Sequence, residues 1–149
     1  MLNRCAKHLL LLSFLCLTSS IIFSQTSYMS DFKEPKVYAG IEVGSKGVKM
    51  SIVEIGTDAQ SNTTFRMLKD SAVNTDFISF TQPAFNATLK GLAAMYSEAM
   101  ILYSIPFDKI FTVISSGVYI QAEKNGRLPM LSNLADSFRQ IINEPLRKV

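Results

Sequence analysis

Residues 37–50 read Val-Tyr-Ala-Gly-Ile-Glu-Val-Gly-Ser-Lys-Gly-Val-Lys-Met, and their pattern is the clearest indication of the fold. Apolar residues alternate with other residues on both sides of a short glycine-rich sequence, 44–47, and such alternation is typical of β-strands. The pattern predicts strands over residues 36–43 and 48–55, joined by a tight turn, because glycine and small polar residues favour hairpin turns. We therefore expect a β-hairpin here.

Beyond the hairpin, the pattern predicts a strand, a helix, a strand and a second helix. Residues 63–68 predict the third strand, residues 70–82 show no period, and helical spacing runs from 83 to 106. A short apolar run at 110–114 predicts a buried strand, and a helical pattern lies between Pro129 and Pro145. The order β-β-β-α-β-α predicts an α/β fold with a mixed sheet that carries helices. The apolar stripes comprise Phe85, Leu89, Leu92, Tyr96, Ala99 and Tyr103 in the first helix, and Leu131, Leu134, Phe138 and Ile141 in the second.

The first 24 residues have the composition of an export signal. Arg4 and Lys7 precede the mostly apolar residues 9–23, and small or polar residues follow from Ser24. This is the layout of a signal peptide, and the apolar run is shorter than the roughly twenty residues of a spanning helix. We expect cleavage after Ser24, export to the periplasm or the medium, and no stable membrane span in the processed chain; an uncleaved anchor is the alternative. Residues 25–35 are expected to be a flexible lead-in to a domain over 36–149.

The composition excludes several classes of function. The chain of 149 residues has a net charge of +3, two Cys and one His, and both Cys and the His fall within the signal segment. Without that segment, the chain has no disulfide framework, no Cys/His zinc site, no thiol nucleophile and no Ser-His-Asp triad. It is also close to neutral, which argues against nucleic acid as a partner, because nucleic-acid binding needs a basic face.

Two predicted turns carry residues suited to binding chemistry. In the hairpin turn, Gly44, Ser45 and Gly47 let main-chain amides approach an anion closely, and Lys46 adds a positive charge. Glu42, on the strand just before, points to the same side as Gly44 and could hold a metal ion through water. Each feature has a plain structural alternative, since hairpin turns need glycine for their own geometry and Glu42 could be a solvent-facing strand charge.

The second turn, Ser115-Ser116-Gly117, follows the predicted strand at 110–114. Small polar turns at the carboxyl ends of strands are where open α/β sheets usually bind ligands. The alternative is an ordinary turn from a strand into a loop.

The two turns and their spacing resemble the Ppx/GppA family of exopolyphosphatases and guanosine pentaphosphate phosphohydrolases, within the superfamily of actin, sugar kinases and Hsp70. Residues 37–50 look like that family's phosphate-binding hairpin, a strand followed by Asp-x-Gly-Ser/Thr-Asn-Ser and a second strand. Residues 111–119, Phe-Thr-Val-Ile-Ser-Ser-Gly-Val-Tyr, resemble the family's strand that ends in Ala-Thr-Ser-Ala-x-Arg. The resemblance covers roughly residues 37–142 and implies the N-terminal half-lobe of an actin-like, ribonuclease H-like fold.

The resemblance also implies site residues. Gly44 and Ser45 match the family's Gly and Ser directly, whereas Glu42 replaces its Asp with a carboxylate one methylene longer. Tyr119 stands where the family has Arg. Mg²⁺ is the implied cofactor, with Glu42 as its candidate ligand through water. The implied phosphate-binding residues are Gly44, Ser45, Lys46, Gly47, Ser115 and Ser116.

The implied function is binding or hydrolysis of phosphoanhydrides, with polyphosphate or a nucleotide polyphosphate as ligand. The family's water-activating glutamate, second phosphate loop and second lobe would all lie beyond Val149, so we expect this chain to be incomplete for catalysis and leave open whether it is an enzyme. A non-catalytic phosphate-binding or interaction module is the alternative, and a sugar or acetate kinase relative is a more distant one. A half-lobe exposes a sheet edge, which predicts a homo-oligomer or a second lobe that covers it.

Overall fold

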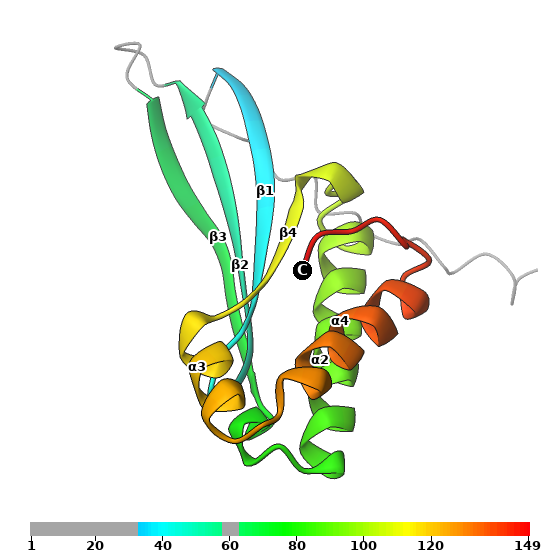
Figure 1. The fold of residues 1–149 in the computed structure, drawn as a ribbon. Helices are drawn as coiled ribbons and strands as arrows, with labels where there is room; N and C mark the ends of the chain where they lie inside the picture. Colours follow the sequence, from blue (N-terminus) through cyan, green and yellow to red (C-terminus); the bar gives the residue numbers. More distant parts are fainter. Residues whose placement is uncertain (1–32, 58–62) are drawn as a thin grey trace, which may run out of the picture. The chain divides into compact units, whose positions relative to one another are not determined.

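The structure is a computed structural model that describes residues 33–57 and 63–149 (Figure 1). The expected signal peptide, 1–24, and most of the expected lead-in, 25–35, lie outside the described residues. Strands β1 (Lys33–Val43) and β2 (Gly47–Thr57) form the predicted hairpin. Among the described residues, none of the helices has the length and apolar character needed to cross a bilayer.

Four strands form one mixed sheet in the order β3-β2-β1-β4 (Figure 1). Strand β3 (Thr63–Asn74) pairs with β2 in antiparallel fashion, and β2 pairs with β1 in the same way. Strand β4 (Ile110–Ile114) returns to lie parallel to β1. The mixed sheet predicted from the element order is therefore confirmed.

Strand β3 is longer than the sequence pattern predicts. The prediction ended this strand at residue 68 and treated 70–82 as irregular, but β3 pairs with β2 as far as Asn74. The pairing shifts register between Ile52 and Val53, which leaves Leu68 as an extra residue on β3. Such a bulge interrupts the alternation of side chains, so the period of two cannot be followed through it. The remaining residues up to the next helix include the short 3-10 helix η1 (Phe77–Ser79).

Helix α2 (Gln82–Ile101) begins as predicted but ends earlier. The Thr81 side chain accepts a hydrogen bond from the Ala84 amide, and Pro83 lies in the first turn, where it costs no hydrogen bond. The prediction extended the helix to Pro106. Instead, Ser104 adopts a left-handed conformation and the Ile105 amide donates to the Ala99 carbonyl, which ends the helix and buries Ile105. Tyr103 has the correct spacing for the stripe but lies outside the helix.

The pattern of apolar residues does not predict the α-helix that follows β4. A 3-10 helix, η2 (Phe107–Lys109), leads into β4, and α3 (Ser116–Lys124) follows it directly. Ser115 is therefore a helix cap rather than part of an open turn, and the order of elements is β-β-β-α-β-α-α. Because α3 buries only Val118 and Ala122, its sequence shows no extended apolar stripe. Helix α4 (Leu128–Ile141) is the predicted last helix.

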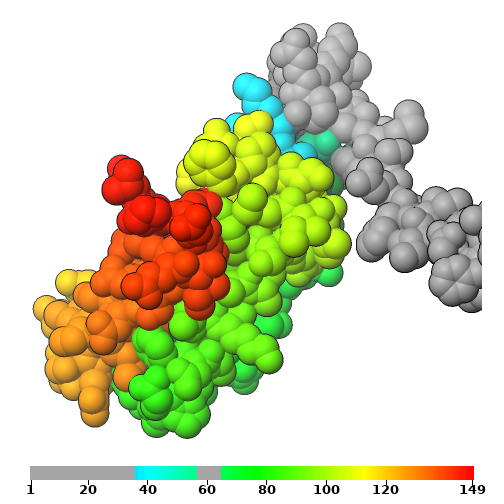
Figure 2. Space-filling view, turned by 90° about the vertical axis from the view of Figure 1, so that its right-hand side faces the viewer, coloured from blue at the N-terminus to red at the C-terminus, as the bar shows by residue number. Residues whose placement is uncertain are grey.

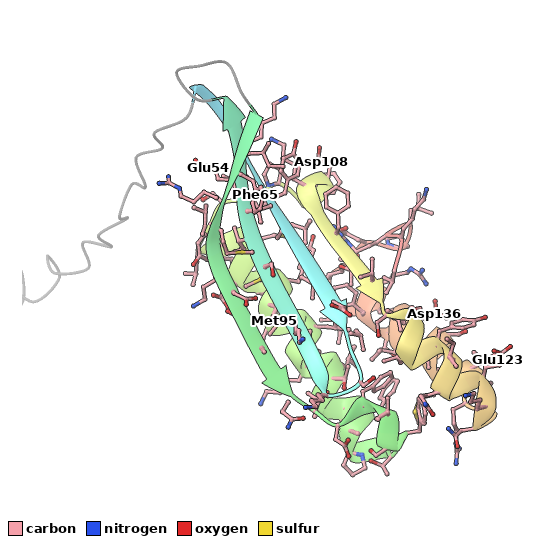
Figure 3. The ribbon with its side chains drawn as sticks, turned by 90° about the vertical axis from the view of Figure 1, so that its left-hand side faces the viewer. Glu54, Phe65, Met95, Asp108, Glu123 and Asp136 are labelled. Atoms are coloured by element: carbon pink, nitrogen blue, oxygen red, sulfur yellow. The ribbon has the colours of Figure 1, made fainter. Side chains whose placement is uncertain are left out.

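The core lies between one face of the sheet and the helices α2 and α4, which lie side by side in Figure 2. Tyr96 of α2 packs edge-on against Phe138 of α4, with 5.8 Å between ring centroids. The opposite face of the sheet, seen in Figure 3, carries none of the described helices. The largest fully buried apolar side chains include Ile41, Met50, Ile52, Phe77, Leu92, Leu134 and Phe138.

Candidate phosphate-binding site

The hairpin turn is closed by its two glycines. The Gly44 amide donates to the Gly47 carbonyl at 2.7 Å, and the Gly47 amide donates to the Gly44 carbonyl at 3.2 Å. Ser45 and Lys46 therefore form the tip of a two-residue turn. Within the described part of the chain, the amides of Ser45 and Lys46 donate to no acceptor, so they are the main-chain groups of this turn that can meet an anion.

Packing against the backbone requires glycine at position 47 but not at position 44. A Cβ on Gly47 would lie 2.0 Å from the Val73 carbonyl oxygen and 2.8 Å from the Thr75 amide nitrogen. A Cβ on Gly44 would lie 3.6 Å from the Gly47 carbonyl oxygen, an ordinary contact. The structural alternative raised by the sequence thus accounts for Gly47 and leaves Gly44 unexplained by packing.

The turn is anchored to the end of β3. The Lys46 carbonyl accepts hydrogen bonds from the amides of Thr75 at 2.9 Å and Asp76 at 3.1 Å. The hydroxyls of Thr75 and Thr88 lie 2.6 Å apart in the core, which ties this corner to α2. These contacts hold the backbone of the turn in place while the Lys46 side chain stays exposed.

The second turn lies beside the first. Parallel pairing sets Val43 opposite Ile114, and the Ser115 amide donates to the Val43 carbonyl at 3.0 Å. Ser45 Oγ lies 3.9 Å from the position that a Cβ on Gly117 would occupy. The two turns that the sequence singles out are thus brought together at the carboxyl ends of β1 and β4 (Figure 1).

Ser115 and Ser116 have different surroundings at the start of α3. The Ser115 hydroxyl accepts a hydrogen bond from the Val118 amide at 3.4 Å and so caps the helix. Ser116 is exposed, and the amides of Ser116 and Gly117 donate to no acceptor within the described ranges. Free amides at the first turn of a helix, together with the helix dipole, favour an anion.

The carboxylate of Glu42 lies close to the hairpin turn. Its Oε1 is 3.9 Å from the position of a Cβ on Gly44, and its register partner on β2 is Lys49. The described residues contain no cluster of three potential metal-ligating side chains. Glu42 alone therefore does not make a metal site, and an ion held there would need oxygen atoms from a bound phosphate.

One neighbour of the turns was not predicted from the sequence. Gly117, which the second predicted turn includes, lies against Ser45 near the start of α3. The backbone of Asp76 reaches the hairpin turn because β3 continues to Asn74. The omission of Asp76 follows from the predicted end of the third strand at residue 68, so the correct length of β3 would have found it.

No protein-family model matches the sequence, and no curated protein matches it. Comparison with solved structures finds the Aquifex aeolicus PPX-GPPA enzyme, with a TM-score of 0.54 and 11% identity over 72% of this chain and 33% of that chain. An exopolyphosphatase-like protein gives a TM-score of 0.53 and 14% identity over 78% of this chain and 33% of that chain. This chain thus spans about a third of the length of these structures. The similarity shows that the described residues share the fold of one part of these Ppx/GppA-type structures, as the resemblance implied.

Proposed function

We propose that this chain binds the phosphoryl groups of polyphosphate or a nucleotide polyphosphate at the two adjoining turns. The observation that carries the proposal is the placement of Ser45 against Gly117, which brings four unengaged amides to one end of the sheet. They belong to Ser45 and Lys46 in the hairpin, and to Ser116 and Gly117 in α3. Polyphosphate is the ligand class that the name of one structural relative suggests, an exopolyphosphatase-like protein. A nucleotide polyphosphate is what the resemblance to the Ppx/GppA family implies.

The chemistry of these groups suits a phosphoryl chain. Backbone amides in a turn and at a helix start bind phosphate oxygens with little selectivity for what the phosphate is attached to. The exposed ammonium group of Lys46 adds a charge-assisted contact, and the hydroxyls of Ser45 and Ser116 add further donors. A ligand with several linked phosphates can engage both turns, and a single small anion can engage only part of them.

Binding, rather than hydrolysis by this chain, is what the described residues support. Cleavage of a phosphoanhydride needs neutralisation of the developing charge and a positioned water. The turns offer Lys46 as a cation and Glu42 as a carboxylate, and Tyr119 stands where the resembling family has Arg. We propose that any hydrolysis requires groups beyond those described. We further propose that the chain is exported, on the basis of its first 24 residues.

The part of the proposal that concerns Mg²⁺ rests on the carboxylate of Glu42 alone. Mg²⁺ is commonly held by one or two carboxylates together with substrate phosphates. We expect Mg²⁺ to strengthen tripolyphosphate binding, and Glu42→Gln to remove that effect without abolishing the binding seen in the absence of the ion. Titrations with and without Mg²⁺ measure both quantities. An equal Mg²⁺ effect in the Glu42→Gln variant would show that Glu42 does not hold the ion.

Calorimetric titration with tripolyphosphate tests the binding proposal. We expect Lys46→Ala and Ser116→Ala each to weaken binding by about tenfold or more, the loss expected for a hydrogen bond to a charged group. Ser97→Ala, an exposed serine on α2, is the matched control and should leave binding unchanged. Equal losses in all three variants, or no binding to the unaltered chain, would favour an interaction module without a phosphate ligand.

Release of phosphate from polyphosphate separates binding from catalysis. The purified chain with Mg²⁺ should release none above background. Turnover that disappears in Ser45→Ala would show that the chain is an enzyme by itself and would contradict this part of the proposal.

A further inference from the structure

A buried pair of threonine hydroxyls links helix α2 to the residue that follows strand β3. The Oγ1 atoms of Thr75 and Thr88 lie 2.6 Å apart, and the Thr88 hydroxyl donates to the Ala84 carbonyl at 2.8 Å. A hydroxyl group has a single hydrogen to donate, so the hydrogen between the two threonines comes from Thr75. The bonds therefore run in one direction, from Thr75 to Thr88 and on to Ala84.

Both threonines are shielded from water. Thr88 is fully buried, and Thr75 is 8% exposed. Water therefore cannot replace Thr88 as the acceptor for the Thr75 hydroxyl unless the surrounding chain moves. Because a buried hydroxyl that loses its partner carries a desolvation cost, the position of Thr75 depends on the hydroxyl of Thr88.

The backbone of Thr75 holds the hairpin turn. The Thr75 amide donates to the Lys46 carbonyl at 2.9 Å, and the Asp76 amide donates to the same carbonyl at 3.1 Å. The tip of a two-residue turn has few free torsions, so the position of this carbonyl constrains the directions of the Ser45 and Lys46 amides. The Thr88 hydroxyl is thus connected to the tip of the turn through one residue.

Close packing of α2 against β2 brings Thr88 to this corner. Gly91, three residues after Thr88, is buried, and a Cβ at this position would lie 3.4 Å from Val48 Cγ2. Val48 belongs to β2 and pairs with Val43 at the base of the hairpin turn. Because residues three apart on a helix lie on the same face, the face of α2 that packs on the hairpin also carries Thr88.

We propose that Thr88 is a positioning residue for the phosphate site: its hydroxyl holds Thr75, and Thr75 holds the tip of the hairpin turn. The inference rests on the proposed function, because it concerns the amides that we expect to bind phosphoryl oxygens. Thr88 itself contacts no ligand, since its side chain is fully buried. Its effect is to fix the Ser45 and Lys46 amides in advance, so that binding does not have to order them.

The second turn has a separate support. Ser116 and Gly117 begin α3, where the Ser115 hydroxyl accepts from the Val118 amide and caps the helix. Loss of the Thr88 hydroxyl should therefore shift the amide NMR signals of the hairpin tip and leave those of Ser116 and Gly117 in place. Equal shifts at both turns would contradict an effect that is specific to the hairpin.

Two substitutions at Thr88 separate positioning from stability. Thr88→Val keeps the volume of the side chain and removes the hydroxyl, whereas Thr88→Ser keeps the hydroxyl and leaves a small cavity. Both should lower the free energy of unfolding, but only Thr88→Val should weaken tripolyphosphate binding in calorimetric titration, by at least about threefold. An affinity that falls by the same factor in both variants, or is unchanged in Thr88→Val, would overturn the proposal.

Thr75→Val keeps the test independent of any folding defect in Thr88→Val. It removes the donor and leaves the Thr88 hydroxyl bonded to the Ala84 carbonyl, so no buried hydroxyl loses its partner. We expect the same loss of affinity as in Thr88→Val, and no further loss when the two substitutions are combined. Losses that add in the double variant would show that Thr88 does not act through Thr75.

Thr112→Val is the matched control. Thr112 is also a buried threonine, 5% exposed, but its Oγ1 has no hydrogen-bond partner within the described part of the chain. The substitution removes a hydroxyl that positions no other described group, so the affinity should equal that of the unaltered chain. A loss as large as that in Thr88→Val would show that any buried threonine has this effect, and would overturn the proposal.

Titration of the unaltered chain separates a failure of this inference from a failure of the proposed function. Absence of tripolyphosphate binding by the unaltered chain would overturn both. Equal binding by the unaltered chain, Thr75→Val and Thr88→Val would leave the phosphate site standing and overturn only the role of Thr88. Weaker binding in both valine variants, with full affinity in Thr88→Ser and Thr112→Val, is the result that we expect.

Discussion

Gly44 and Gly47 close the same turn, but different constraints act on them. A side chain at Gly47 would overlap the backbone of β3, whereas a side chain at Gly44 meets only ordinary contacts. We expect Gly47→Ala to lower the free energy of unfolding by about 3 kcal/mol or more, because backbone atoms cannot move aside as a side chain can. Gly44→Ala should change it by less than about 1 kcal/mol. Urea unfolding of the two variants measures the difference, and equal losses would contradict the geometry of the turn.

The titration of the Tyr96 phenol makes the free energy of unfolding depend on pH in the alkaline range. Burial, followed by the hydrogen bond that its hydroxyl donates to Glu144, raises the pKa of Tyr96 from 10.0 to about 12. The folded chain therefore holds the phenol proton more tightly than the unfolded chain does. The resulting stability is fully present below pH 10 and is lost as the pH rises through about 12.

We expect the free energy of unfolding to fall by roughly 3 kcal/mol over that range because of Tyr96. Tyr96→Phe should lack this decrease, which urea unfolding of both chains across that pH range measures. A variant with the same pH profile as the unaltered chain would show that the phenol does not titrate in this way.

At the start of α3, two neighbouring serines have different expected roles, one in the stability of the helix and the other in phosphate binding. Ser115 caps the helix through the Val118 amide, whereas the hydroxyl of Ser116 is exposed and forms no such contact. Ser115→Ala should therefore cost about 1 kcal/mol of stability, the usual value of a helix cap, while Ser116→Ala should cost little. Thermal unfolding measures the first effect and tripolyphosphate titration the second. A stability loss in Ser116→Ala as large as that in Ser115→Ala would contradict the assignment of Ser115 as the helix cap.

The elements that could be predicted from the sequence are those that bury one side only. Such burial gives a regular spacing of apolar residues. Residues 36–55 alternate, and α4 repeats its apolar residues at helical spacing, so the hairpin and the last helix were found. The bulge at Leu68 hides the second half of β3, and α3 is too short and exposed to show a stripe. The phosphate role of the six predicted residues stays a prediction. Their meeting place depends on the parallel pairing of β1 with β4, which joins residues far apart in the sequence.

At the scale of the whole described domain, α2 and α4 stabilise the sheet through a shared core. Phe138 is fully buried and contacts Tyr96 on α2. Phe138→Ala should lower the free energy of unfolding by about 3–5 kcal/mol through the lost burial and the cavity left behind. Ile141→Ala, an exposed position on the same helix, is the matched control and should cost far less. Similar losses at the two positions would contradict the packing of α4.

Amide NMR spectra of the chain during addition of tripolyphosphate show whether the tips of the two turns bind phosphoryl oxygens. We expect saturable shifts at the amides of four residues, Ser45, Lys46, Ser116 and Gly117. Changes should be smaller at Gly44 and Gly47, whose amides already bond across the hairpin. Shifts confined to other parts of the chain, or none at these four amides at saturating ligand, would contradict binding at the two turns.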